Sequence, residues 1–309
     1  MIPLKKDLLV PSSADGALSG RIVQRFGAQV LVEDAQGGLY RCTLRRRLQD
    51  AVCGDGVAWT HDAARRGHVV TAIAPRRNLL QRADARGQLK GIAANLSQLV
   101  IVLAPRPAPN PLLLDRYLIA AENLPAQALL VLNKCDLCSA DDAALALLDE
   151  YAALGYAIVQ TSTLKGTGID TLAARIGEGT AVCVGQSGVG KSSLVQALIP
   201  GLEIRIGALS ALSGEGQHTT TSAALYHLPQ GGSLIDSPGL RDFIPQGLDK
   251  AALQQGFVEI RALAGECRFH NCLHLHEPGC AVQAAVARGQ INARRYAHYR
   301  TLLTQEAMA

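Results

Sequence analysis

Short alternating segments of apolar and polar residues fill the first quarter of the chain. Five of them, punctuated by glycine and aspartate, cover residues 21–25, 28–33, 38–44, 55–60 and 67–73. Short, closely spaced segments of this kind predict β-strands that close into a small barrel. An OB-fold is the commonest five-stranded choice, and an SH3-like barrel would produce much the same pattern.

The pattern changes after Pro75, where residues 76–82 are interpreted as a linker. The run 98–104 is continuously apolar and ends before Pro105, as expected of a buried parallel strand. Strands and helices then alternate, which predicts a doubly wound α/β sheet. The further strands are expected at 128–132, 157–161 and 180–184, and the helices at 112–123, 140–153 and 169–176. Beyond Pro245 the pattern is helical again.

Composition narrows the class of protein. The chain has 309 residues, 48% of them apolar, which suggests two or three domains with packed cores. The N-terminus lacks the features of a signal peptide, and no apolar run reaches the ~20 residues of a membrane span. We therefore expect a cytoplasmic, soluble protein without a membrane partner. Nothing in the sequence demands a dimer, and a monomer is expected.

Charge is spread unevenly along the chain. Residues 1–90 carry 15 Lys and Arg against 8 Asp and Glu, a net charge of +7 on a protein whose total is +4. A basic N-terminal domain suggests a polyanion such as RNA as partner, although an ordinary solvated surface would look the same. Two clusters are candidates for contacts with phosphate: Arg41, Arg45, Arg46, Arg47, Arg65 and Arg66 in the barrel, and Arg294, Arg295 and Arg300 near the end.

The segment Gly185–Ser192 fits the P-loop pattern GxxxxGK[ST] at every position. It follows an apolar strand and opens a helix, so backbone N–H groups and the helix N-terminus would converge on phosphate. Lys191 can reach the β- and γ-phosphates, and Ser192 can ligate Mg²⁺ bound with the nucleotide. The expected contact residues are Gly185, Gln186, Ser187, Gly188, Val189, Gly190, Lys191, Ser192 and Ser193.

A second motif, Asn133-Lys134-Cys135-Asp136, follows the buried strand that ends at Leu132 and predicts guanine recognition. A carboxylate at Asp136 accepts hydrogen bonds from the guanine ring N–H and amino group. Facing adenine it would keep an unmet buried charge, which is costly. The Lys134 stem would pack along the base, and Asn133 would tie this loop to the P-loop. Ser162 and Thr163, after the next strand, are the expected support for the base.

Switch elements follow the P-loop. Asp236-Ser-Pro-Gly239 matches the DxxG element, in which Asp236 would hold Mg²⁺ through water and the Gly239 N–H would sense the γ-phosphate. Thr220 or Thr221 is expected to ligate Mg²⁺ directly. Leu240 occupies the position after the glycine, and its side chain cannot orient a water molecule. His218 is therefore the candidate catalytic residue, with a purely structural role in the switch as the alternative.

The order of these motifs is unusual. The guanine-reading loop precedes the P-loop, and the DxxG element comes last. This order indicates a circularly permuted GTPase domain in which the spatial site is kept and the chain ends are moved. The permutation places a C-terminal extension next to the last switch, where it could anchor that switch.

That extension contains Cys267, Cys272, His274 and Cys280. Three thiolates and one imidazole form a closed tetrahedral set, so we expect one structural Zn²⁺ ion. His270 and His276 are additional candidates. Disulfides or a Cys-rich loop without metal are the alternatives.

Taken together, these motifs resemble the small ribosomal subunit biogenesis GTPases of the RsgA (YjeQ) family. The resemblance implies an α/β fold: an N-terminal OB-fold RNA-binding domain (1–76), a circularly permuted P-loop GTPase domain (77–245) and a C-terminal, mostly helical zinc-binding domain (246–309). It also implies late maturation of the small ribosomal subunit, contact with its rRNA, and hydrolysis of GTP to GDP stimulated by the subunit. His218 matches the histidine that is thought to be catalytic in that family.

Two other functions are compatible with the residues alone. The chain could be a GTP-dependent switch that recruits a protein partner without ribosome dependence. It could also be a P-loop ATPase in which the Asn133–Asp136 motif occurs by chance.

Overall fold

The first five strands close into a barrel, as the alternating pattern predicts. They are β1 (Leu18–Phe26), β2 (Gln29–Glu33), β3 (Leu39–Leu44), β4 (Gly56–Asp62) and β5 (Gly67–Ile73). Their order is β1-β2-β3-β5-β4, and a β4–β1 pairing completes the ring. Only β3 and β5 run parallel. Inward-facing aliphatic side chains and Trp59 form the core, and a 3-10 turn (Arg46–Leu48) follows β3.

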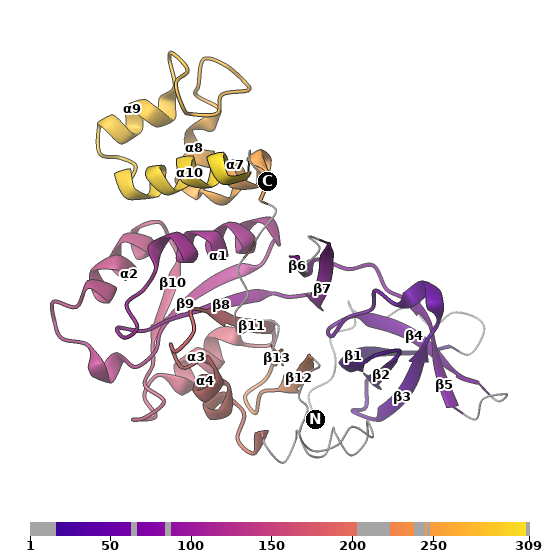
Figure 1. Cartoon of the computed structure of the whole chain (residues 1–309). Coiled ribbons are helices and arrows are strands. Elements are labelled where there is room, and N and C mark those ends of the chain that lie inside the picture. The colour runs from indigo at the N-terminus through magenta and orange to yellow at the C-terminus, as the bar shows by residue number, and fades with distance from the viewer. Residues whose placement is uncertain are drawn as a thin grey trace.

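This computed structural model describes residues 17–62, 67–83, 88–202, 223–237, 245 and 248–306. Within these residues, no helix is both long enough and apolar enough to cross a membrane. Figure 1 shows the barrel on one side of a central sheet, with a helical unit on another side.

The expectation of a plain linker at 76–82 was wrong. Residues Leu79–Ala83 form β6, which pairs with β7 (Leu89–Ala94) as an antiparallel hairpin. Leu80 is buried, whereas Gln81 and Arg82 are exposed. The hairpin buries little of its own surface, so its sequence carries too few apolar positions to show a period of two.

The central sheet is doubly wound. Its order is β10-β9-β8-β11-β13-β12, and all neighbours are parallel except β12 and β13. The strands are β8 (Gln98–Leu103), β9 (Gln127–Leu132), β10 (Ala157–Gln160), β11 (Thr180–Gly185), β12 (Ala224–His227) and β13 (Ser233–Asp236). Apolar side chains cover both faces of the sheet, so its central strands are continuous hydrophobic runs rather than alternating ones.

Four helices cover the two faces. α1 (Pro111–Asn123) and α2 (Ala143–Ala153) pack on one face, and α3 (Ile169–Ile176) and α4 (Lys191–Leu198) on the other. Local chemistry sets where α1 and α2 begin. The Asn110 side chain accepts the Leu113 N–H at 3.1 Å, and Asp142 accepts the Ala144 N–H at 2.9 Å. Pro111 occupies the first turn of α1, where no N–H is needed.

The barrel continues the central sheet. β1 pairs with β12 at Gln24 and Ala224, which joins both units into one eleven-stranded sheet. Arg21 donates to the Thr180 hydroxyl at 2.7 Å, and Glu33 lies 2.7 Å from the His227 ring. The barrel is therefore attached to β12 and to Thr180 of β11, the strand that leads into the P-loop.

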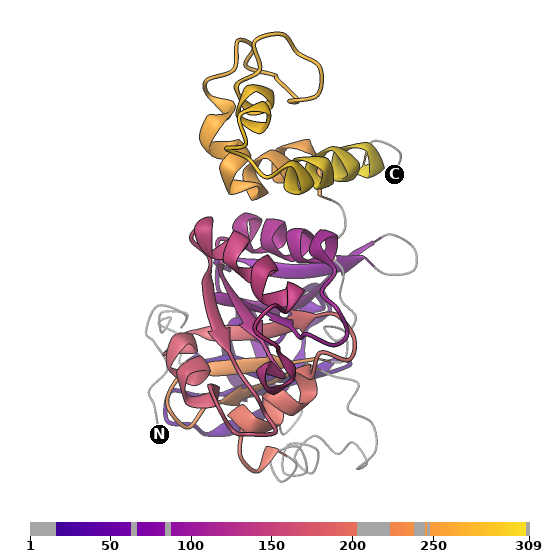
Figure 2. The same cartoon turned by 90° about the vertical axis from the view of Figure 1, so that its left-hand side faces the viewer.

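The C-terminal unit contains α7 (Lys250–Gly256), α8 (Val258–Ala264), α9 (Ala281–Ala287) and α10 (Ala293–Glu306). Both views show it beside α1 (Figures 1 and 2). Its core includes Ile119 of α1, and a Cβ on Gly256 would lie 2.5 Å from the Ile119 Cγ2 atom. Glycine at position 256 thus permits the close approach of α7 to α1.

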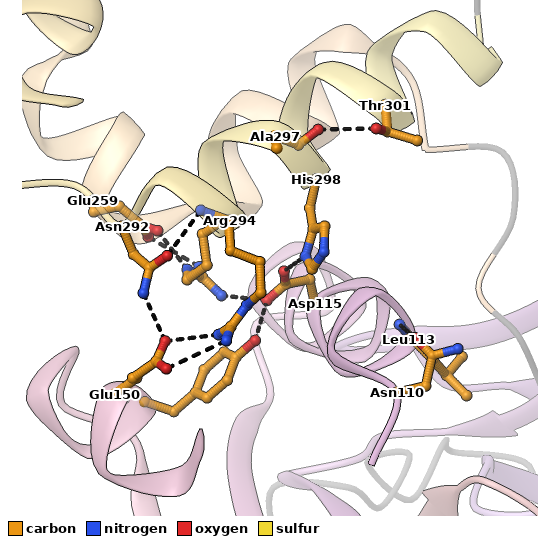
Figure 3. Close-up of polar contacts among 12 residues, drawn as sticks. Asn110, Leu113, Asp115, Glu150, Glu259, Asn292, Arg294, Ala297, His298 and Thr301 are labelled. Carbon is orange, nitrogen blue, oxygen red and sulfur yellow. Dashed lines mark hydrogen bonds and ion pairs between the residues drawn. The ribbon is translucent and has the colours of Figure 1, made fainter. Parts of the chain in front are cut away.

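A polar network crosses the same contact (Figure 3). The buried Asp115 carboxylate of α1 accepts hydrogen bonds from the Tyr151 hydroxyl, the Arg295 guanidinium and the His298 ring. Arg295 also donates to Glu259. Burial by itself would lower the pKa of Arg295, but the hydrogen bonds to Glu259 and the charges of Asp115 and Glu259 raise it above its ordinary value. Arg295 is therefore a cation held in the interior.

Candidate functional site

Three loops and the last residue of β13 lie at the carboxyl ends of the parallel strands. Asn133–Asp136 follow β9, Thr161–Gly168 follow β10, the P-loop follows β11, and Asp236 ends β13. Because parallel strands present their carboxyl ends at one edge, ligands in such folds bind there. The structure thus brings the described motif residues to one side of the sheet.

Asn133 joins the two principal loops. Its side chain is fully buried, and its Nδ2 atom donates to the Val189 carbonyl oxygen at 3.0 Å. Its Oδ1 atom accepts a hydrogen bond from the Thr161 hydroxyl at 3.1 Å. One amide therefore ties together the loops after β9, β10 and β11. The sequence suggested the contact between Asn133 and the P-loop, whereas the contribution of Thr161 was missed.

Lys134 strengthens the same connection. It adopts a left-handed conformation (φ 58°), and its ammonium group donates to the Gly188 carbonyl oxygen at 2.6 Å and to the Arg106 carbonyl oxygen at 3.3 Å. The aliphatic stem thus extends over the P-loop. The contact with Arg106 involves a main-chain atom, so no residue type in the sequence could have signalled it.

Asp136 points toward the loop after β10. Its carboxylate accepts a hydrogen bond from the Ser162 hydroxyl, and the Ser162 side chain is buried. The Ser162 oxygen also accepts the Lys165 N–H at 3.1 Å, which closes the loop on itself. Thr163 is half-buried in the same turn. Asp136 and Ser162 therefore lie together, as the base-reading and base-supporting residues are expected to.

The P-loop conformation depends on glycine. Gly190 has φ 91°, and a Cβ there would lie 2.5 Å from the Asn133 Nδ2 atom. The Lys191 ammonium lies inside the loop, where it donates to the carbonyl oxygens of Gly185 and Gln186 at 2.7 and 2.8 Å. α4 begins at Lys191, so its unbonded N–H groups face the loop. This arrangement can bind an anion such as a phosphate group.

The remaining switch residues lie largely outside the described part of the chain. Asp236 is described and half-buried at the end of β13. His218, Thr220, Thr221, Gly239 and Leu240 lie outside the described residues, so their expected roles stay predictions.

The four expected metal ligands form one cluster in the helical unit. One ligand atom from each of Cys267, Cys272, His274 and Cys280 lies within 4.8 Å of every other. The His274 Nδ1 atom is 3.5 Å from the sulfur atoms of both Cys267 and Cys280. Ligands of a tetrahedral zinc ion are separated by roughly 3.4–3.8 Å, given its bond lengths. The cluster therefore fits such an ion.

The pKa shifts of the cysteine and histidine side chains in the cluster also favour a bound cation. Burial raises the pKa of the Cys272 thiol to about 12, so a thiolate there needs a positive charge beside it. Burial lowers the pKa of His274, which favours the neutral imidazole that binds metals. Within the described residues, His270 and His276 do not belong to the cluster, and both are exposed.

A second layer of contacts holds the backbone of this cluster. The Glu277 carboxylate accepts the N–H groups of Leu273, Leu275 and His276 at 2.7–3.0 Å. Burial would raise the pKa of Glu277, but these backbone hydrogen bonds together lower it to about 2. Tyr299 of α10 donates to the Leu273 carbonyl oxygen at 3.0 Å. Contacts within the protein therefore already hold the backbone of this loop in place.

The basic surfaces differ from expectation at the C-terminus. Arg295 is buried, and Arg294 is paired with Glu150 of α2 at 2.7 Å, so neither is a free phosphate contact. Arg300 stacks on Tyr296 and is exposed. In the barrel, the arginines that are described remain exposed: Arg41, Arg45, Arg46 and Arg47. Arg65 and Arg66 lie outside the described residues.

Comparisons with known proteins agree with the geometry. The family model described as RsgA GTPase matches residues 73–244. A protein of Chromohalobacter salexigens named "Small ribosomal subunit biogenesis GTPase RsgA" is 50% identical over 92% of this chain and 85% of its own length. A Pseudomonas aeruginosa protein of the same name is 48% identical over 92% of this chain and 84% of its own length.

Two solved structures resemble the whole chain. The crystal structure of YjeQ from Thermotoga maritima has a TM-score of 0.77 and 31% identity, over 94% of this chain and 99% of that one. The structure of YloQ, described as a circularly permuted GTPase, has a TM-score of 0.74 and 25% identity, over 95% and 96%. The predicted fold class, a permuted core with a barrel before it and a helical unit after it, is confirmed.

Proposed function

This chain belongs to the RsgA GTPase family and is a GTPase, and from that premise we propose that it acts in the maturation of the small ribosomal subunit. It would bind that subunit and hydrolyse GTP to GDP and phosphate there, with turnover stimulated by the subunit. The printed name shared by its relatives supports the choice of partner.

The main support for a nucleotide site is the pair of hydrogen bonds by which the Asn133 side chain connects neighbouring loops. Its amide connects the P-loop to the loop that holds Asp136, so a guanine base and its phosphates would be bound by one rigid unit. In this proposal Asp136 reads guanine, Lys134 covers the base, and Ser162 and Thr163 support it. Residues 185–193 would hold the phosphates, with Lys191 on the β- and γ-phosphates.

Magnesium would be held by oxygen ligands, which are the ones this ion prefers. The Ser192 hydroxyl and the Asp236 carboxylate are the described groups that suit it, together with Thr220 or Thr221. When bound, the ion neutralises charge that develops on the phosphate oxygens. His218 would orient the attacking water, because Leu240 has no polar atom to do so.

Zinc is proposed for the cysteine–histidine cluster, with Cys267, Cys272, His274 and Cys280 as its ligands. All four positions are filled by protein atoms, so the site would be structural and would have no open position for substrate. The helical unit has a small core, and the ion would supply part of its folding free energy.

The remaining parts of the proposal concern partners and organisation. The barrel, within residues 1–76, would bind rRNA through its exposed arginines. The GTPase domain would span residues 77–245, and the zinc-binding domain 246–309. The protein would act as a monomer in the cytoplasm.

GTP hydrolysis by the purified chain tests the function directly, measured alone and with small or large ribosomal subunits. Stimulation by the small subunit only is the expected result. If neither subunit stimulates hydrolysis, the ribosomal role is wrong and a switch that recruits a protein partner becomes the better hypothesis.

Nucleotide choice tests the site separately. Asp136→Asn should shift preference from GTP toward xanthosine triphosphate, because an amide can donate to the xanthine oxygen. Asp141→Asn is the matched control, since Asp141 is an exposed aspartate close in the sequence. Unchanged preference in Asp136→Asn would show that Asp136 does not read the base.

A further inference from the structure

The eight cysteines of this chain fall into three groups. Three are enclosed in the barrel or sheet cores, where burial raises their pKa to about 12: Cys42, Cys53 and Cys183. Three belong to the cysteine–histidine cluster. The two that remain, Cys135 and Cys138, are half-buried and lie on either side of Asp136 and Leu137. The proposed function uses neither thiol.

Their spacing and backbone geometry suit a disulfide. The sequence Cys135-Asp-Leu-Cys138 is a C-x-x-C motif, which in a cytosolic protein indicates redox chemistry. The Cys138 N–H donates to the Cys135 carbonyl oxygen at 3.1 Å, so the four residues form a tight turn. Such a turn places its end Cα atoms within about 7 Å. Disulfides join Cα atoms about 4.4–6.8 Å apart.

The turn is part of the nucleotide site. The Cys135 N–H donates to the Thr161 carbonyl oxygen at 3.0 Å, and the Asp136 carboxylate accepts from Ser162. Cys138 packs at the edge of the core that α2 also covers. Burial raises the pKa of Cys138, and the negative charges of Asp142 and Asp136 add to this effect. Both effects favour the protonated thiol, so the Cys138 sulfur must lose its proton before it can attack an oxidised partner sulfur.

We propose that Cys135 and Cys138 form a reversible modification site, a dithiol that a hydroperoxide oxidises to a disulfide, and that this disulfide lowers the affinity for guanine nucleotide. The second part rests on the proposed role of Asp136. One sulfur attacks the peroxide O–O bond, which releases an alcohol or water and leaves a sulfenic acid. The other thiol displaces the hydroxyl group as water, so two thiols lose two electrons and two protons in total.

The disulfide should lower nucleotide affinity because its formation would displace Asp136. The sulfur atoms must approach to about 2.05 Å, which closes a ring that contains Asp136. Cys138 must leave its packed position, and the turn must shift relative to Thr161 and Ser162. Hydrogen bonds to a carboxylate are directional and strong, so misplacing Asp136 should weaken nucleotide binding at least tenfold. Reduction by a dithiol would restore the original turn.

The zinc-loaded full chain is treated with hydrogen peroxide, and affinity is measured by titration with a fluorescent GDP analogue. Trypsin cleaves after Lys134 and Lys165, so peptide 135–165 contains both thiols and no other cysteine. We expect this peptide to resist alkylation and to be two hydrogens lighter. We expect GDP affinity to fall at least tenfold and to recover with dithiothreitol, while zinc content, measured in parallel, is unchanged.

Two variants separate the disulfide from other damage. Cys138→Ser should keep its GDP affinity after peroxide, because no disulfide can form. Cys42→Ala, which removes a buried barrel thiol, should still lose affinity. Equal loss in Cys138→Ser would overturn the proposal, since oxidation of one thiol would then suffice.

Three other results would each contradict part of the proposal. A peptide 135–165 that stays reduced while the zinc cluster is oxidised would overturn the modification site. A disulfide without any change in GDP affinity would overturn its effect on binding. If the reduced chain binds no guanine nucleotide, the proposed nucleotide site fails and the effect on affinity fails with it, whereas the peptide still decides whether the disulfide forms.

Discussion

Replacing Arg295 with methionine should destabilise the contact between the helical unit and α1 by about 3–5 kcal/mol. The Arg295 and Asp115 side chains are 2% and 0% exposed, and Glu259 is 10% exposed. Removing the cation leaves Glu259 without its ion pair and Asp115 with only Tyr151 and His298, at a place that water scarcely reaches. Arg295 also lies over the rings of Tyr151 and Phe257, at 5.1 and 5.0 Å. Methionine keeps most of this packing, so the lost interactions with the Glu259 and Asp115 carboxylates account for most of the loss.

The variant is best followed by urea denaturation with two probes. Far-UV circular dichroism reports the helices, whereas the single tryptophan, Trp59, is buried in the barrel and reports that unit. The helical transition should move to lower urea, and the fluorescence transition should move less. Asp115→Asn added to Arg295→Met should recover at least about 1 kcal/mol, because it removes one of the two buried charges that have lost Arg295.

Arg294→Met is the matched control. Arg294 is the adjacent residue on α10 and also pairs with a carboxylate, that of Glu150. Both side chains of this pair are about one-third exposed, at 33% and 36%, so its loss should cost no more than about 1 kcal/mol. If Arg295→Met costs no more than Arg294→Met, the network around Asp115 is solvated and the reasoning is refuted.

Three further predictions concern the two sites and the buried thiols. Asn133→Ala should weaken GDP binding about tenfold or more in a fluorescence titration, because Val189 and Thr161 lose a buried partner; unchanged affinity would show that Asn133 does not position the loops. Glu277→Gln should speed zinc release to a chromogenic chelator, since one amide oxygen replaces a carboxylate that accepts three N–H groups; equal rates would contradict this. The thiols of Cys42, Cys53 and Cys183, with folded pKa values of about 12 against about 8.5 in the unfolded chain, contribute stability that is complete below pH ~8.5 and is lost as pH rises toward 12. At pH 8 they should therefore resist iodoacetamide in the native chain and react in denaturant, as mass spectrometry would show; native labelling would contradict the burial.

Much of the fold could be predicted because its determinants are local. The five barrel strands and the strands β8, β9, β10 and β11 of the central sheet were expected close to their observed positions, since each is a short run with its own apolar pattern and turn residues. Strand β12 was not expected. The hairpin β6–β7 was missed for the opposite reason. Its strands are stabilised by pairing with each other, and only a few of their side chains are buried.

The candidate site was predictable to the extent that it consists of motifs. Asn133, Asp136, Ser162 and Lys191 lie in or directly after the loops that follow β9, β10 and β11, and the rules of parallel sheets bring such loops together. Thr161 was missed because its contact with Asn133 depends on how two loops approach each other. The reading of Arg294 and Arg295 as phosphate contacts was wrong because charge in a sequence says nothing about which face of a helix is covered.

The sequence by itself determined the candidate chemistry: a P-loop pattern, an Asn-Lys-x-Asp motif, three cysteines and a histidine at metal-binding spacing, and the permuted order of these parts. Each depends on residue types within a few positions, so short-range geometry is enough to recognise it. Only the tertiary structure decided that one amide ties three loops together, that a cation is buried between two units, and that Cys135 and Cys138 are half-buried beside Asp136. These features depend on burial and on contacts between distant segments, which are set by packing of the whole chain.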